Sequence, residues 1–161
     1  MKVEYINPFV QASASVIEMM LGLTPVRGNL TARPEVFTTQ QVNIVCGVTG
    51  GIQGQVIYGM SMMTADKIAS RMLGQPVVTF DKLAASAIAE LGNMISGNSI
   101  TLLAQAGFTA DITPPTIIRG SNVKITTLDI PAIVIQMNIP EVGLLEINVS
   151  IKEAVARAAA A

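Results

Sequence analysis

Residues 81–106, DKLAASAIAELGNMISGNSITLLAQA, have the apolar spacing of a long amphipathic helix. One face of this helix is aliphatic or small, with Ala84, Ile88, Leu91, Ile95 and Leu102. The opposite face has a narrow polar stripe, made of Ser86, Glu90 and Asn93 and followed by Gly97. We therefore predict a helix, capped by Asp81 or Thr79, that buries one face and presents the polar stripe on the other.

The chain before this helix is predicted to form two further helices and a β-hairpin. Asn7-Pro8 favours the start of the first helix, because Asn is a good N-cap and Pro suits the first helical position. Gly22 is the expected C-cap, and residues 26–34 are expected to be a loop or a short edge strand. Two alternating runs around the Gly50-Gly51 turn predict the hairpin. The runs are residues 42–48 and 56–62, and the second helix is predicted over residues 64–73.

The last third of the chain has the period-2 alternation of β-strands. The strands are predicted at residues 123–127, 133–139 and 145–151. Because the connections between them are short, the strands are expected to be antiparallel neighbours. The predicted fold class is α+β, a single domain in which helices pack on one face of an antiparallel β-sheet. We assign residues 1–152 to this domain and residues 153–161 to an Ala-rich C-terminal tail.

Composition excludes several classes of function. Lys and Arg total 10 against 11 Asp and Glu in the 161 residues, so no basic surface is available to bind nucleic acid. The chain has no His, which removes Ser-His-Asp and Cys-His nucleophiles and the commonest transition-metal ligand. Its one cysteine, Cys46, lies in an apolar run and is expected to be a buried thiol in the core.

Nothing in the sequence predicts a membrane segment. No run approaches the ~18 apolar residues of a transmembrane helix. Glu4, Asn7 and Pro8 interrupt the apolar stretch that a signal peptide needs at the N-terminus. We therefore expect a cytoplasmic protein.

Three stretches are candidates for a site. The glycine-rich residues 47–54, GVTGGIQG, lack the Lys and Ser or Thr of a phosphate-binding loop and are better explained as a hairpin turn. Residues 111–115, DITPP, are expected to be a rigid connector. The stripe of Ser86, Glu90 and Asn93 is either a solvated face or a docking face, since small neighbours leave room for a partner's backbone.

Three short sequences in the same order resemble the CheC/CheX/FliY family of phosphatases, which act on the chemotaxis response regulator CheY. They are GVTGGIQG at residues 47–54, SAIAELGNM at residues 86–94 and DITPPT at residues 111–116. The central one contains the Ser-x-x-x-Glu-x-x-Asn pattern, and Pro114-Pro115 follow it, slightly closer to the Asn than the proline of the family signature. These three short sequences resemble the CheX type more closely than the CheC type. The first helix has Leu21 where a second Glu-x-x-Asn copy, starting at Glu18, needs Asn, so one site per chain is expected.

The resemblance implies hydrolysis of an aspartyl phosphate on a CheY-like receiver domain, in chemotaxis or another two-component pathway. Asn93 and Glu90 are the implied catalytic pair. Asn93 positions the attacking water and Glu90 pairs with a Lys of the receiver. Ser86, Gly97, Pro114 and Pro115 are the implied partner-binding residues. The receiver supplies Mg²⁺, the chain itself needs no cofactor or metal, and a homodimer through the β-sheet is implied.

Two other classes of function remain as alternatives. A non-catalytic module that binds the receiver as a scaffold would use the same helix face without hydrolysis. A metabolic enzyme is disfavoured, because the sequence has no His, no cluster of metal ligands and no nucleotide-binding motif.

Overall fold

The computed structural model describes residues 1–127 and 129–155, and these form three helices and nine strands. In chain order they are α1 (Val3–Leu21), β1 (Val26–Arg33), β2 (Val36–Thr38), β3 (Val42–Gly50), β4 (Ile52–Met60), α2 (Met62–Leu73), α3 (Lys82–Gln105), β5 (Ala110–Ile112), β6 (Thr116–Arg119), β7 (Lys124–Thr126), β8 (Ala132–Ile139) and β9 (Gly143–Glu153). Residues 156–161, most of the Ala-rich tail, lie outside the described part of the chain. The boundary placed after residue 152 therefore stays a prediction.

The main sheet is antiparallel throughout and has the strand order β1-β8-β9-β4-β3-β5, with β6 also paired to β3. The predicted β3–β4 and β8–β9 hairpins are both present, with Val48 opposite Gly54 and Ile139 opposite Gly143. Residues 26–33, expected to be a loop or a short edge strand, form the edge strand β1. The expected pairing of residues 123–127 with residues 133–139 is wrong, because β7 pairs with β2 in a separate two-stranded ribbon and β8 lies between β1 and β9.

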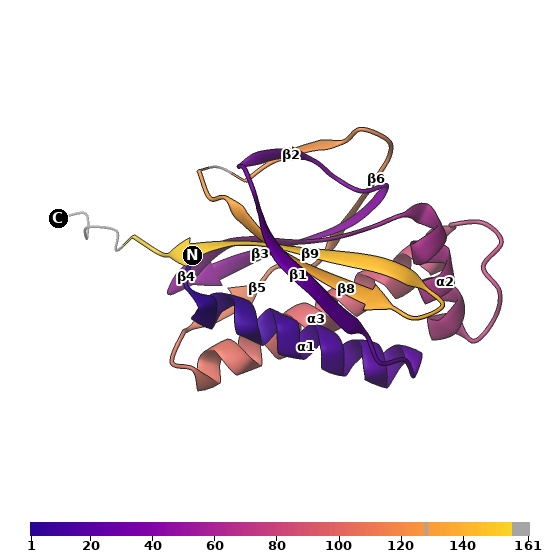
Figure 1. Ribbon diagram of the computed structural model, residues 1–161, viewed down its shortest axis with the longest axis horizontal. Helices are drawn as coiled ribbons and strands as arrows, with labels where there is room; N and C mark the ends of the chain where they lie inside the picture. Colours follow the sequence, from indigo (N-terminus) through magenta and orange to yellow (C-terminus); the bar gives the residue numbers. More distant parts are fainter. Residues whose placement is uncertain (128, 156–161) are drawn as a thin grey trace.

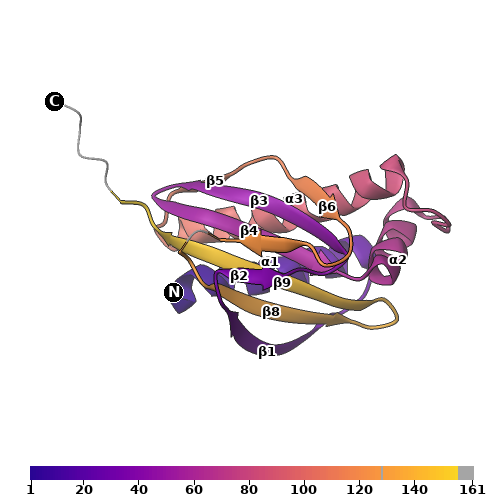
Figure 2. The ribbon, with the colours of Figure 1, turned by 90° about the horizontal axis from the view of Figure 1, so that it is seen from above.

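Two long helices cover one face of the sheet, as predicted (Figure 1). α1 and α3 contact each other there, and the β2–β7 ribbon lies over the opposite face (Figures 1 and 2). Alternate residues of the central strands, including Ile44, Cys46, Val56, Tyr58, Leu145 and Ile147, are buried under the helices. Because strand side chains alternate between faces, the core lies between the sheet and this helical layer. No helix of the described chain is both long and apolar enough to cross a membrane.

The start of α1 differs from the prediction. The helix begins at Val3 and contains Pro8 in its interior, although proline there removes a backbone hydrogen bond. Tyr5 and Ile6 explain the extension, because both side chains are almost fully buried and the Tyr5 ring packs edge-on against Phe108, 5.1 Å between centroids. The tertiary burial of this first turn therefore outweighs the local preference of proline.

The other helix boundaries are closer to expectation. Gly22 adopts the left-handed conformation (φ 66°) and ends α1 as predicted. α2 begins at Met62, before the predicted Thr64, because the Ser61 hydroxyl accepts the Thr64 N–H and is the N-cap.

A buried ion pair ties the edge strand β1 to β9 on the face opposite the helices. Both carboxylate oxygens of Glu146 accept from Arg33 Nη2, at 3.0 and 2.9 Å, and Arg33 Nη1 donates to Asn148 Oδ1 at 3.2 Å. Asn148 in turn donates to the Ile57 carbonyl on β4. These hydrogen bonds satisfy polar groups that burial would otherwise leave unpaired.

Candidate functional site

The polar stripe is positioned by α3, which runs from its predicted cap. The Asp81 carboxylate accepts the Ala84 N–H at 2.9 Å and caps the helix, which then continues to Gln105. The apolar face packs on the sheet and neighbouring helices, with Ile88, Leu91 and Ile95 fully buried. Burying that face fixes the rotation of α3 about its axis, so the stripe faces away from the core.

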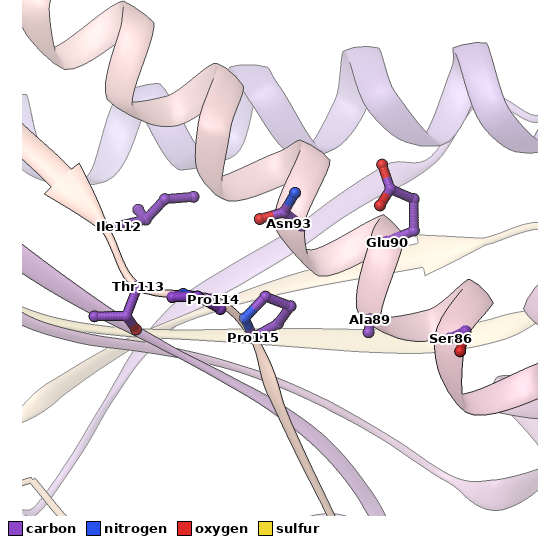
Figure 3. Close-up of a pocket in the computed structure, with 8 residues that line it drawn as sticks. All are labelled: Ser86, Ala89, Glu90, Asn93, Ile112, Thr113, Pro114 and Pro115. Atoms are coloured by element: carbon purple, nitrogen blue, oxygen red, sulfur yellow. The ribbon is translucent and has the colours of Figure 1, made fainter. Parts of the chain in front are cut away.

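The stripe forms one wall of an open groove of about 540 Å³. The helix wall carries Ser86, Ala89, Glu90 and Asn93, and the facing wall is formed by Ile112, Thr113, Pro114 and Pro115 (Figure 3). The two walls are distant in sequence, yet the fold brings them together at the same edge of the sheet. The predicted residues Ser86, Glu90, Asn93, Pro114 and Pro115 therefore share one site.

The facing wall is held by the edge of β3. β5 pairs with the end of β3 and β6 pairs with its beginning. Residues 113–115 therefore connect two short strands that both pair with β3. Proline has no N–H to continue the ladder, so Thr113 makes the last contacts. Its N–H donates to the Gly47 carbonyl at 2.9 Å, and its Oγ1 accepts the Gly47 N–H at 2.8 Å.

The described residues that line the groove carry one charge, which is negative. Of the described residues that line it, Glu90 alone is ionisable, and it is exposed. Within the described chain, no hydrogen bond or salt bridge engages the Glu90 carboxylate or the half-buried Asn93 amide, whereas the Ser86 hydroxyl donates to its own helix at Lys82 O. Both groups are therefore free to meet an incoming partner.

The described residues of the groove provide neither a cluster of metal ligands nor a cation for a phosphate. No group of three or more His, Cys, Asp or Glu side chains that fits a metal occurs in the described residues. A phosphate is recognised by cations and clustered N–H donors, and here a carboxylate would repel it. A carboxamide can accept a hydrogen bond from water and donate one to an oxygen at the same time. The arrangement suits a site completed by a partner that brings its own cations.

Gly97 does not line this groove, unlike the other predicted residues. It lies one turn beyond Asn93 on the same helix, and a Cβ added there would meet no atom within 4 Å. Three lining residues, Ala89, Ile112 and Thr113, were not singled out from the sequence. Thr113 was within the DITPPT stretch, but its role depends on Gly47, whose proximity only the fold reveals.

The corresponding positions of α1 form no comparable site. Glu18 is exposed, but Leu21 is 4% exposed and belongs to the core. Leu21 also ends the helix, and its carbonyl accepts from Arg71 Nη1 at 3.2 Å. The end of α1 is thus packed in the core, whereas the middle of α3 lines an open groove.

The strongest shifts in pKa lie outside the groove. Lys2 donates to the Glu153 carboxylate, and Tyr5 donates to the same oxygen at 3.2 Å. The hydrogen bond raises the pKa of Lys2 and lowers that of Glu153, and burial raises the pKa of Tyr5. Burial also raises the pKa of Tyr58 and of Cys46, which is fully buried as predicted. None of these groups lines the groove.

The fold is that of CheC-like proteins. A crystal structure of a CheC-like superfamily protein from Shewanella sp. PV-4 superimposes with a TM-score of 0.84 at 23% identity, over 94% of this chain and 99% of that one. The chain belongs to the family of the chemotaxis phosphatase CheX, whose model matches residues 42–138.

Two relatives are more similar in sequence. The CheY-P phosphatase CheX of Thermotoga maritima is 35% identical over 131 residues, 81% of this chain and 84% of the relative. A crystal structure of the CheX–CheY–BeF3–Mg²⁺ complex from Borrelia burgdorferi matches with a TM-score of 0.81 and 31% identity, over 94% of this chain and 100% of that one. The predicted family and fold class are confirmed.

Proposed function

We propose that the groove between α3 and residues 112–115 is the active site of a phosphatase that dephosphorylates a CheY-like receiver domain in the cytoplasm. The observation that carries the proposal is the pairing of an unengaged carboxylate with an unengaged amide in a groove without cations. Such a site cannot retain a small phosphate, but it complements an aspartyl phosphate surrounded by a metal ion and a lysine. The family membership and the CheX–CheY complex of a relative support this choice of substrate.

In the proposed mechanism Asn93 places the attacking water. Phosphoryl transfer requires little covalent chemistry from the protein but needs a nucleophile in line with the leaving oxygen. The Asn93 carbonyl oxygen accepts a hydrogen from the water, and its NH₂ donates to a phosphoryl oxygen. Holding the water in this geometry lowers the activation free energy by several kcal/mol, which corresponds to a rate increase of ~10²-fold or more. The cause is that the water loses its orientational entropy when the receiver docks, before the transition state is reached.

Glu90 docks the receiver one turn before Asn93. Its carboxylate pairs with the lysine of the receiver site, and this contact fixes Asn93 relative to the phosphorylated side chain. Ser86 extends the same wall, and Pro114 and Pro115 form the opposite wall against which the receiver packs. Gly97 lies beside the groove, where the absence of a side chain lets the partner approach α3. Mg²⁺ belongs to the receiver, and the chain contributes no cofactor of its own.

The alternative is a receiver-binding scaffold that docks through the same groove without hydrolysis. The two functions differ in the lifetime of the phosphorylated receiver. Candidate receivers of the source organism are phosphorylated with ³²P-labelled acetyl phosphate, and loss of label is followed with and without this chain. A shortened half-life at substoichiometric chain supports the phosphatase. Binding with an unchanged half-life supports the scaffold and overturns the proposed activity.

A homodimer through the sheet is a second part of the proposal. β1 pairs with β8 on one side only, and its edge carries the exposed apolar residues Val26 and Leu30. An unpaired edge with exposed apolar side chains favours pairing with a second copy. Light scattering after size exclusion is expected to give twice the 16.9 kDa chain mass, and a monomer at micromolar concentration would contradict the dimer.

A further inference from the structure

The strand β3 contacts both walls of the groove, although none of its residues lines it. Ile44 meets α3 at Gly92, between Glu90 and Asn93 in the chain. Gly47 meets the facing wall at Thr113. The separation of the two walls therefore depends on how closely each one rests on this single strand.

The α3 contact admits no side chain at Gly92. A Cβ there would lie 2.7 Å from Ile44 Cγ2, 3.0 Å from Cδ1 and 3.3 Å from Cβ. Ile44 cannot give way easily, because it is fully buried and β-branched, and its strand is paired on both sides, with Tyr58 and Ile117. The backbone of α3 thus packs directly on the Ile44 side chain at this position.

A buried hydrogen bond also holds the next turn of α3 close to the sheet. The Tyr58 hydroxyl and Ser96 Oγ are 2.6 Å apart, and both side chains are inaccessible to solvent. Ser96 is one turn after Gly92, so the two contacts follow the same line along the helix. Together they fix the distance from the sheet, and the rotation about the helix axis, of the segment that carries Asn93.

The facing wall is fixed by a closely similar device. A Cβ at Gly47 would lie 3.0 Å from both Thr113 Cγ2 and Oγ1, so the threonine side chain lies directly across the glycine. Its paired hydrogen bonds to the Gly47 backbone replace the ladder that Pro114 and Pro115 interrupt. The two prolines are consequently held at a set distance from β3.

We propose that β3 sets the width of the groove, and that Gly92 positions the helix wall with Asn93 while Thr113 positions the facing wall. The proposal rests on the proposed phosphatase function for its kinetic test. A groove that must fit around a receiver's phosphorylation site tolerates little change in width, because a displacement of ~1 Å of a positioning group costs up to ~10²-fold in rate. Gly92, which does not line the groove, thereby acts through Asn93, and Thr113 acts through the distance between the two walls.

The first test lifts α3 from the sheet. Gly92→Ala is expected to lower kcat for receiver dephosphorylation by about 10- to 100-fold, even though alanine is the better helix former. Combining it with Ile44→Ala removes the methyl groups that the new Cβ meets, and the double variant is expected to recover most of the lost kcat. Ile68→Ala, a similarly buried change in α2, is the control for lost stability and is expected to keep the wild-type kcat.

The second test loosens the facing wall and does not depend on whether Gly92→Ala folds. Thr113→Val keeps the shape of the side chain but leaves the Gly47 N–H without its acceptor, and kcat is expected to fall about tenfold. Thr113→Ser keeps the hydroxyl and is expected to restore at least half of the wild-type kcat. Equal losses in the two variants would show that the hydroxyl does not position the wall.

The outcomes separate this inference from the proposed function. A wild-type chain that never shortens the lifetime of a phosphorylated receiver overturns the function alone. A Gly92→Ala variant with wild-type kcat overturns the inference, as does a loss that Ile44→Ala fails to rescue. A crystal structure of Gly92→Ala in which Asn93 and Pro114 keep their separation overturns it whether or not the chain is a phosphatase.

Discussion

The two long helices α1 and α3 pack on the same face of the sheet and against each other (Figure 1). They differ in the surroundings of their Glu residues and of the residues that follow three positions later. α3 carries Glu90 and Asn93 in its middle, over an open groove. α1 carries Glu18 and Leu21 in its last turn, where Leu21 is buried and Arg71 covers the helix end. α1 thus differs from α3 in two respects, because it has Leu21 in place of the amide and because this position is packed in the core instead of facing a groove.

Removing the amide of α3 is expected to have the largest effect on activity. Asn93→Ala should lower the rate of receiver dephosphorylation by about 100-fold or more, since the water loses the group that orients it. Asn93 makes no hydrogen bond within the described chain, so the fold should keep its unfolding midpoint. Asn98→Ala, an exposed asparagine of the same helix, is the matched control. Comparable losses in both variants would mean that the amide at position 93 has no special role.

Supplying the missing amide to α1 tests whether the motif alone makes a site. Leu21→Asn places a polar group in the core and is expected to lower the free energy of unfolding by about 2–4 kcal/mol. In the Asn93→Ala background it should restore no activity, because α1 has no facing wall. Met19→Asn, at a neighbouring exposed position, should change stability by about 0.5 kcal/mol or less. Recovered activity in the Leu21→Asn variant would refute the importance of the groove. Urea denaturation and the ³²P assay measure the two effects.

The two glutamates distinguish docking from general surface charge. Glu90→Gln is expected to lower kcat/KM about tenfold at low salt, with much less difference at ~1 M salt, because the ion pair with the receiver is screened there. Glu18→Gln removes the same charge from α1 and should leave kcat/KM unchanged. If the two variants behave alike, the attraction is due to net charge and not to the groove.

The smallest effect is expected where α1 begins. Lys2 and Tyr5 both donate to Glu153, which lowers the pKa of that carboxyl below 4.5. The stabilisation is complete above the pKa of the unfolded chain and is lost as the pH falls through the lower pKa of the folded chain. Glu153→Gln should therefore lower Tm slightly at pH 7, and the difference should shrink well below pH 4.5. A difference in Tm that persists at pH 2 would exclude the ionised carboxylate as its cause.

Much of the fold could be predicted where the signal is local. The α3 helix, its Asp81 cap, the hairpin around Gly50-Gly51 and the strands β8 and β9 follow from periodicity and turn residues. The start of α1 could not be predicted, because Tyr5 is buried against Phe108, about 100 residues away. For the same reason the short strands β2, β5 and β6 were missed, since each depends on a distant partner strand.

The site was predictable as a list of side chains but not as a shape. Helical spacing placed Ser86, Glu90 and Asn93 on one stripe, and the family resemblance pointed to Pro114 and Pro115. Nothing local indicates that Thr113 docks on Gly47, or that Gly92 is glycine because Ile44 lies beneath it. These contacts join segments distant in the chain, and they determine the width of the groove.

The described residues that line the groove include no lysine or arginine, and this has a consequence for the proposed turnover. In the proposed reaction, inorganic phosphate left in the groove would meet the Glu90 carboxylate and neutral groups, because the described lining residues include no cation to hold it. Under the proposed function we therefore expect phosphate to be released without a separate slow step. Phosphate at millimolar concentration should leave the initial rate unchanged, whereas competitive inhibition by phosphate would reveal a cation in the site.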